Sequence, residues 1–285
     1  MKQQILQYCS NMKGLLIAAL MLFACALNVN AQSWQQPERS QDNLDALARV
    51  EVKAYKFAEA GDIDMEYGAY VPTSYDSASP TPLVIALHGL GSDIMYMMEY
   101  NNLIELAESY GYIVATPMGY NERGWYGARG LGNEFNRVRN ERSGQSDPKN
   151  LGQLSESDVL NVLQEVRDSY NIDNSRTYLI GQSMGGGGTW YLGSKYADNW
   201  AALAPMAPAI YISPDILDGA KDLPVMVVMG DADEVVDVKV TRQWVARMEE
   251  MGMEHEYIEV PGGSHSSAGR ENIARVFEFL SQHQK

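Results

Sequence analysis

Five consecutive residues, Gly181-Gln182-Ser183-Met184-Gly185, carry the strongest chemical signal in the sequence. A serine between such glycines suits a sharp turn that lifts its hydroxyl above the end of a sheet. Glycine is needed there because a Cβ would crowd the neighbouring backbone. An apolar strand candidate precedes the turn and a helix candidate follows it. This context favours Ser183 as a nucleophile over a bystander serine in a glycine-rich turn.

A serine hydroxyl becomes an effective nucleophile when a base takes its proton, and histidine is the usual base. The chain has four histidines. His255 precedes a strand candidate and His283 lies near the C-terminal end, so both are expected at the surface. His88 ends a buried strand candidate and belongs to another motif. His265 lies in a flexible turn between the last predicted strand and the last predicted helix, and we predict it as the base.

A carboxylate must fix the tautomer of that histidine and stabilise its protonated form. The segment 229–236 (MGDADEVV) follows an apolar strand candidate and offers three acids. We assign the role to Asp233, one turn beyond the strand end, and expect Asp231 to hydrogen-bond within its own loop. The resulting chain order, Ser183, Asp233 and His265, is one of the known orders of a Ser-His-Asp triad.

Acyl transfer also requires hydrogen-bond donors for a developing oxyanion. The backbone N–H of Met184, directly after the nucleophile, is one predicted donor. The second is expected from the flexible segment 88–91 (HGLG) that follows the strand candidate 82–87. We assign it to Leu90, with Gly89 as the alternative, and expect His88 to hold this loop.

Strands and helices must alternate to position these loops at one edge of a sheet. The strand candidates 82–87, 112–117, 177–180, 201–204, 224–229 and 257–260 alternate with helix candidates at 103–110, 155–170, after Ser183, 238–251 and 272–280. This order predicts a mostly parallel sheet with helices on both faces. Two earlier strand candidates, 50–57 and 65–71, are expected to be antiparallel at one sheet edge. Ser155, with Asp158 three residues later, is expected to cap the helix 155–170.

The segment Gly119–Leu154 interrupts the alternation, because it is rich in Gly, Asn, Arg and Ser and shows no clear periodicity. A loop of that length in a compact domain is usually functional or disordered. Its aromatic residues Trp125 and Tyr126 favour a substrate-binding loop, in which we predict these two side chains to contact the substrate.

Composition narrows the class of protein. The 285-residue chain carries a formal net charge of −15, which argues against nucleic acid partners because they bind Lys- and Arg-rich surfaces. Both cysteines, Cys9 and Cys25, lie in the first 31 residues, so thiol catalysis and thiolate metal sites are not expected in the remainder. No metal-ligand spacing or phosphate-binding loop stands out, and we expect no cofactor.

The N-terminal region predicts export. Lys2 and Lys13 precede an apolar run at 14–29, and small residues follow it. This pattern is typical of a secretory signal peptide over residues 1–31, and the run is shorter than the roughly 20 residues of a membrane span. A lipoprotein signal with acylated Cys25 is the alternative. We expect residues 32–285 to form a single catalytic domain that is periplasmic or secreted, and the oligomeric state stays open.

Together these motifs resemble the α/β-hydrolase esterases, most closely the polyhydroxybutyrate-depolymerase-like and feruloyl or acetylxylan esterase group near the dienelactone hydrolases. The matching segments are 87–89, 171–176, 178–186, 188–190, 230–236 and 263–265, within a resemblance that spans about 67–280. Asp237 stands where proline is common and Gly187 where a larger residue is common. The resemblance implies the α/β-hydrolase fold and hydrolysis of carboxylic esters, on small molecules or polymers. It does not identify the acid or the alcohol, whose contacts are expected in 119–154.

Two alternative functions remain open at the level of sequence. Prolyl-oligopeptidase-like serine peptidases share these motifs, although this chain has no room for a separate β-propeller domain. A catalytically silent binding protein on the same scaffold is the second alternative. The presence of Ser183, Asp233 and His265 together argues against it, because a silent protein has no physical need of all three.

Overall fold

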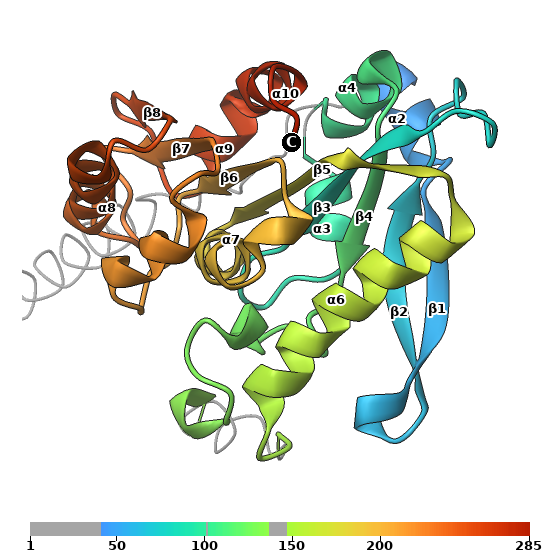
Figure 1. Cartoon of the computed structure of the whole chain (residues 1–285), viewed down its shortest axis with the longest axis horizontal. Coiled ribbons are helices and arrows are strands. Elements are labelled where there is room, and N and C mark those ends of the chain that lie inside the picture. The colour runs from blue at the N-terminus through green and yellow to red at the C-terminus, as the bar shows by residue number, and fades with distance from the viewer. Residues whose placement is uncertain (1–40, 101, 137–146) are drawn as a thin grey trace, which may run out of the picture. The chain divides into compact units, whose positions relative to one another are not determined.

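An eight-stranded sheet is the frame of the computed structural model, which describes residues 41–100, 102–136 and 147–285 (Figure 1). The strands are β1 (Glu51–Phe57), β2 (Ile63–Tyr70), β3 (Thr81–Leu87), β4 (Ile113–Pro117), β5 (Ile172–Gln182), β6 (Ala202–Met206), β7 (Val225–Gly230) and β8 (His255–Val260). Their order is β1-β2-β4-β3-β5-β6-β7-β8. The pairs β1–β2 and β2–β4 are antiparallel and all other pairs are parallel. The predicted parallel sheet with an antiparallel edge is therefore confirmed. The predicted signal peptide, residues 1–31, lies outside the described residues.

The central strand β3 shows why the sheet is buried on both faces. All seven of its residues are buried. Leu83, Ile85 and Leu87 enter one hydrophobic cluster, whereas Val84 and Ala86 enter another on the opposite face. Successive side chains of a strand point to opposite faces, so an unbroken apolar run places core on both sides.

Helices cover both of these faces. They are α2 (Gln41–Leu47), α3 (Met95–Met98), α4 (Leu103–Tyr110), α6 (Leu151–Ser169), α7 (Met184–Lys195), α8 (Val238–Met251), α9 (Ser267–Glu271) and α10 (Ile273–Ser281). Apolar residues of α6, α7 and α8 pack into one cluster, and those of α4, α9 and α10 pack into the other (Figure 1). None of the described helices has the length and apolar character needed to cross a membrane.

The start of α6 corrects the predicted capping box. The helix begins at Leu151, four residues before Ser155, and its N-cap residue Asn150 makes no side-chain cap. The N–H groups of Gly152 and Gln153 instead donate to the carbonyls of Gly132 and Leu131, each at 3.0 Å. A neighbouring loop thus satisfies the free donors of the first turn, which a local sequence pattern cannot reveal.

Ser155 and Asp158 lie inside α6 and are fully buried. The Oδ1 atom of Asp158 accepts a hydrogen bond from the Tyr55 hydroxyl at 2.7 Å, and its Oδ2 accepts one from the N–H of Gly119 at 2.6 Å. Ser155 Oγ accepts the N–H of Tyr126 at 2.9 Å. These side chains fasten the segment that follows β4 to the helix.

Burial raises the pKa of Asp158 from 3.8 to about 6, although hydrogen bonds from Tyr55, Gly119 and Tyr120 oppose the shift. Between these pH values the folded chain binds more protons than the unfolded chain, so this group lowers stability as the pH rises. At 1.36 kcal/mol per pKa unit, a shift of about two units corresponds to about 3 kcal/mol. We expect Asp158→Asn to remove this decrease, measured as the free energy of unfolding in urea at pH values across the interval.

The matched control is Asp168→Asn, which makes the same charge change on the exposed face of α6. Its unfolding free energy should follow the wild-type pH dependence. Parallel curves for Asp158→Asn and wild type would show that the folded and unfolded states do not differ in the titration of Asp158.

Candidate active site

Ser183 occupies a strained turn between β5 and α7. Its backbone has φ of 57° and ψ of −115°, a conformation that a residue with a side chain rarely adopts. Hydrogen bonds hold it from both sides: its N–H donates to the Met206 carbonyl at 3.0 Å, and its own carbonyl accepts from Gly187 at 3.0 Å and Ala209 at 2.9 Å. The turn therefore depends on β6 and the loop after it as well as on its own helix.

The glycines on either side of Ser183 permit close backbone approach. A Cβ at Gly181 would lie 2.4 Å from the Gly185 carbonyl oxygen, and one at Gly185 would lie 2.1 Å from the carbonyl oxygen of Leu87. Both distances are too short for any side chain. The start of α7 can therefore rest directly against the end of β3.

The structure brings Ser183, His265 and Asp233 into one hydrogen-bonded chain. His265 Nε2 lies 2.8 Å from Ser183 Oγ, and His265 Nδ1 lies 2.8 Å from Asp233 Oδ2. The Asp233 side chain is fully buried and that of His265 is 14% exposed. Asp233 Oδ1 accepts the N–H groups of Val235 and Val236, each at 2.8 Å. The carboxylate is thus fixed by its own loop while it faces the imidazole, an arrangement that suits proton transfer from the serine.

Asp231 makes a different hydrogen bond from the one expected. Its Oδ1 accepts the N–H of Gly262 at 2.6 Å, so it bonds to the turn before His265 and not within its own loop. The two loops also touch directly, because a Cβ at Gly230 would lie 2.1 Å from the Gly263 carbonyl oxygen. Asp231 therefore ties the loop of Asp233 to the loop of His265.

The predicted oxyanion donors are the N–H groups of Met184, directly after Ser183, and of Leu90, in the loop after β3. Met184 is the first residue of α7, where helix N–H groups have no partner within the helix and the dipole favours negative charge. Leu90 is 37% exposed, and no hydrogen bond of its N–H is present among the described residues. A Cβ at Gly89 would lie 3.5 Å from the Cβ of Ser183, so this loop runs alongside the serine.

His88 is fully buried beneath that loop. Its Nδ1 lies 2.8 Å from the Gly89 carbonyl and its Nε2 lies 2.9 Å from the Met118 carbonyl. Burial lowers the pKa of His88, and a neutral imidazole donates through only one of its nitrogens. The ring joins the end of β3 to the end of β4, which agrees with the expected holding role.

Tyr126 and Trp125, the predicted substrate contacts, lie in the short 3₁₀ helix η2 (Trp125–Gly127). Tyr126 is fully buried, and its hydroxyl donates to the His88 carbonyl at 3.2 Å. Its ring fills the space above Gly188, where a Cβ would lie 2.6 Å from Tyr126 Cδ2. In this conformation Tyr126 supports the site from within the core. Trp125 is 4% exposed and its ring meets that of Tyr211 edge-on at 5.1 Å.

Gln182 is a site residue whose role sequence reasoning missed. Its side chain is buried, and its Oε1 accepts the Tyr96 hydroxyl at 3.1 Å while its Nε2 donates to the His265 carbonyl at 3.0 Å. The amide therefore links α3, the short helix that follows β3, with the loop of the histidine. Its position beside Ser183 was the only available signal, because both partners are distant in sequence.

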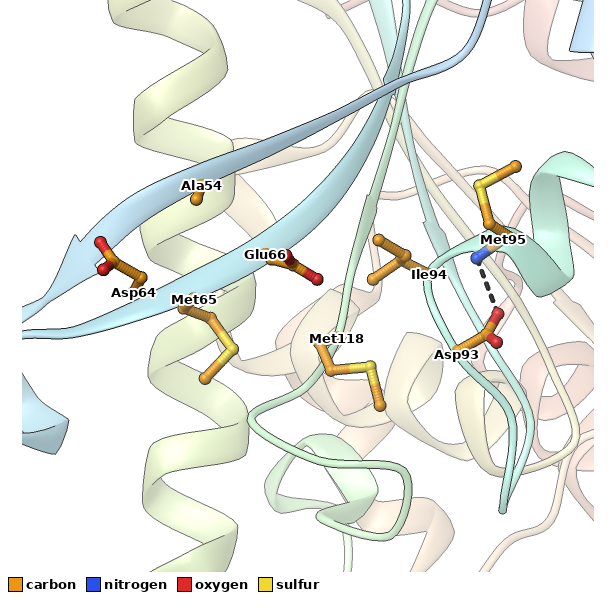
Figure 2. A pocket seen from close by; sticks show the side chains of 8 residues that line it. All are labelled: Ala54, Asp64, Met65, Glu66, Asp93, Ile94, Met95 and Met118. Carbon is orange, nitrogen blue, oxygen red and sulfur yellow. Dashed lines mark hydrogen bonds between the residues drawn. The ribbon is translucent and has the colours of Figure 1, made fainter. Parts of the chain in front are cut away.

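A separate cavity of about 430 Å³ opens beside the loop after β3 (Figure 2). None of the predicted site residues lines it. Its wall combines three methionines with acidic side chains, and Figure 2 shows the Glu66 carboxylate between β2 and Ile94. The lining residues are Ala54, Asp64, Met65, Glu66, Asp93, Ile94, Met95 and Met118. Within the described residues, no group of three or more potential metal-binding side chains lies close enough together to hold an ion.

Comparisons with known proteins identify the family of the chain. The family model Esterase, described as "Putative esterase", matches residues 59–226, which is more than half of the chain. The bifunctional acetylxylan esterase/xylanase of Neocallimastix patriciarum is 26% identical over 226 residues, which cover 78% of this chain. The chain spans only 29% of that relative's length.

Solved structures show that the chain has the α/β-hydrolase fold. A thermostable esterase matches with a TM-score of 0.63 and 22% identity, over 84% of this chain and 64% of the other. A ferulic acid esterase from Anaeromyces mucronatus matches with a TM-score of 0.58 and 20% identity, over 82% of this chain and 90% of the other. The predicted fold class is thus confirmed.

The buried amide of Gln182 yields a stability prediction. Gln182→Leu leaves the His265 carbonyl and the Tyr96 hydroxyl without their partner, and an unsatisfied buried polar group costs about 1–3 kcal/mol. We expect the free energy of unfolding to fall by about 2 kcal/mol, measured by urea denaturation. Gln153→Leu, on an exposed position of α6, is the control and should change it by less than about 0.5 kcal/mol. Equal effects of the two changes would contradict the linking role.

Proposed function

The chain belongs to the Esterase family, and on that premise we propose that it hydrolyses carboxylic esters through an acyl-enzyme intermediate. The observation that carries the proposal is the hydrogen-bonded chain from Asp233 through His265 to Ser183. It lies at a strained turn, beside two backbone N–H groups that can stabilise an oxyanion. No cofactor takes part in this chemistry.

In the proposed first step, His265 Nε2 takes the proton of Ser183 Oγ as this oxygen attacks the ester carbonyl carbon. The carbonyl oxygen becomes an oxyanion that accepts hydrogen bonds from the N–H groups of Met184 and Leu90. The intermediate collapses, the bond to the alcohol oxygen breaks, and His265 donates its proton to that oxygen. Asp233 stabilises the imidazolium that exists between these events.

In the second step, water replaces the alcohol. His265 takes a proton from the water as its oxygen attacks the acyl carbon of the Ser183 ester. The resulting oxyanion is held by the same two amides. Collapse breaks the bond to Ser183 Oγ, which recovers its proton from His265, and the free acid leaves.

For the substrate class, we propose acyl esters carried by carbohydrate polymers or small molecules. Support comes from the names of the relatives, which include an acetylxylan esterase and a ferulic acid esterase. A serine peptidase and a silent binding protein remain the competing functions. Hydrolysis of esters without hydrolysis of peptide bonds would exclude the peptidase. Labelling of Ser183 by a fluorophosphonate would exclude the silent binding protein.

We also propose that residues 1–31 direct export and are then removed, which would place the catalytic domain in the periplasm or outside the cell. The support is the pattern of lysines, apolar run and small residues in the sequence. Mass spectrometry of the protein recovered from a bacterial host tests this. A new N-terminus at Gln32 is expected. A lipid attached to Cys25 would establish the lipoprotein alternative, and retention of Met1 would contradict export.

Substitution of the proposed triad gives the central test, with p-nitrophenyl acetate as substrate near neutral pH. We expect Ser183→Ala to lower kcat/KM by about 10⁴-fold or more, because it removes the nucleophile. We expect Asp233→Asn to lower it by about 10³- to 10⁴-fold, because the histidine is no longer held in the required tautomer. Fluorescence or circular dichroism must confirm that each variant is folded.

Asp231→Asn is the matched control, since it removes a carboxylate from the same loop while leaving Asp233 in contact with His265. Its activity should stay within roughly tenfold of wild type, since Asp231 acts only through the turn at Gly262. A larger loss in Asp231→Asn than in Asp233→Asn would reverse the assignment of the acid. Wild-type protein that neither hydrolyses esters nor reacts with a fluorophosphonate would overturn the proposed function.

A further inference from the structure

Four side chains form a cluster that we call the aromatic platform: Trp125, Arg129, Phe135 and Tyr211. The guanidinium carbon of Arg129 lies 4.3 Å from the ring centre of Tyr211, 4.9 Å from that of Trp125 and 5.5 Å from that of Phe135. The rings of Trp125 and Tyr211 meet edge-on, with an interplanar angle of 88°. The rings therefore hold the cation in place from several sides.

Arg129 makes no ion pair with a carboxylate among the described residues, which is also true of Arg167 and Arg270. The chain has 37 acidic residues and a net charge of −15, and other arginines such as Arg242 form ion pairs. Arg129 makes no ion pair or hydrogen bond within the part of the chain that the structure describes. A guanidinium carries five N–H donors in a planar fork, and those of Arg129 make no hydrogen bond among the described residues.

Tyr211 presents the surface on which such a ligand could lie. It is 61% exposed, although its ring is fixed by Arg129 and Trp125. An exposed aromatic ring that is held rigidly offers contact area at little cost in conformational entropy. Rings of sugars and of aromatic acids both have a flat apolar face that can pack on it.

The aromatic platform lies on the two segments that flank the nucleophile. The Ala209 N–H donates to the Ser183 carbonyl at 2.9 Å, and Tyr211 follows two residues later, a span of at most about 7 Å. On the other segment, Trp125 precedes Tyr126, whose hydroxyl donates to the carbonyl of His88. His88 begins the segment 88–91 that contains Leu90. A substrate with its ester at Ser183 can therefore extend over the platform.

We propose that Arg129 and Tyr211 form a subsite that binds a ring bearing a free carboxylate, on a part of the substrate beyond the scissile ester. The ring packs on Tyr211, and the carboxylate accepts paired hydrogen bonds from the guanidinium of Arg129. A uronic acid of a polysaccharide and an aromatic carboxylic acid share this chemistry. The net negative charge of the chain repels anions, so an anionic substrate group needs a local cation such as Arg129 to bind here. The subsite rests on the proposed esterase function, but binding to it can be measured without turnover.

The test measures binding by calorimetry to the full chain carrying Ser183→Ala, which cannot consume an ester. One pair of probes is xylotriose with and without a glucuronic acid substituent, and the other is para-methoxybenzoate and its neutral amide. We expect the anionic member of at least one pair to bind roughly tenfold more tightly than its neutral partner. A hydrogen bond between charged groups contributes enough free energy for a difference of this size. A preference within the first pair identifies a sugar acid, and a preference within the second identifies an aromatic acid.

Adding Arg129→Gln should abolish this preference, whereas Arg275→Gln should preserve it, because Arg275 is an exposed arginine outside the platform with the same charge. Tyr211→Ala, at an exposed position that should tolerate the change, should weaken both members of the preferred pair. Equal binding of anionic and neutral probes in both pairs would overturn the subsite. So would a preference that survives Arg129→Gln. Hydrolysis of p-nitrophenyl acetate by wild type reports on the esterase function separately, so that one proposal can fail while the other stands.

Discussion

The direct contact between the end of β3 and the start of α7 is the constraint on which the site depends. Gly185 rests against the carbonyl oxygen of Leu87, and only a residue without a side chain permits this. The contact lets the turn at Ser183 adopt its strained backbone beside Gly89 in the loop after β3. Close backbone approach, which glycine permits, thus sets the distance between the turn at Ser183 and the end of β3.

The loops around the serine are held by polar contacts that cross between elements. Gln182 joins α3 to the loop of His265, and Asp231 joins the loop of Asp233 to that of His265. On the other side, Asp158 fastens the segment after β4 to α6. Because each bond joins parts distant in sequence, the relative positions of the loops persist only when the whole sheet is formed.

Prediction from the sequence was most accurate where a local pattern alone decides the structure. The helices at Leu103–Tyr110 and Val238–Met251 have the predicted bounds, since their apolar residues recur with helical spacing. The predicted start of α6 at Ser155 was wrong. The helix begins at Leu151, because carbonyls of Leu131 and Gly132 accept the free N–H groups of its first turn. Tyr126 was predicted to contact the substrate, and this stays a prediction; the structure adds that its ring is buried against Gly188. Aromatic content in a loop cannot distinguish a ligand contact from a buried support.

The sequence by itself determined the type of fold and the order of its chemical groups: alternating strands and helices, a serine between glycines, and an acid and a histidine after later strands. These are properties of neighbouring residues and their spacing. Only the tertiary structure decided that Asp231 bonds to the turn at Gly262, that Gln182 joins α3 to the loop of His265, and that Arg129 and Tyr211 meet. The reason is physical: each of these contacts depends on the side-chain directions and loop paths that the packed sheet imposes, and no local pattern encodes them.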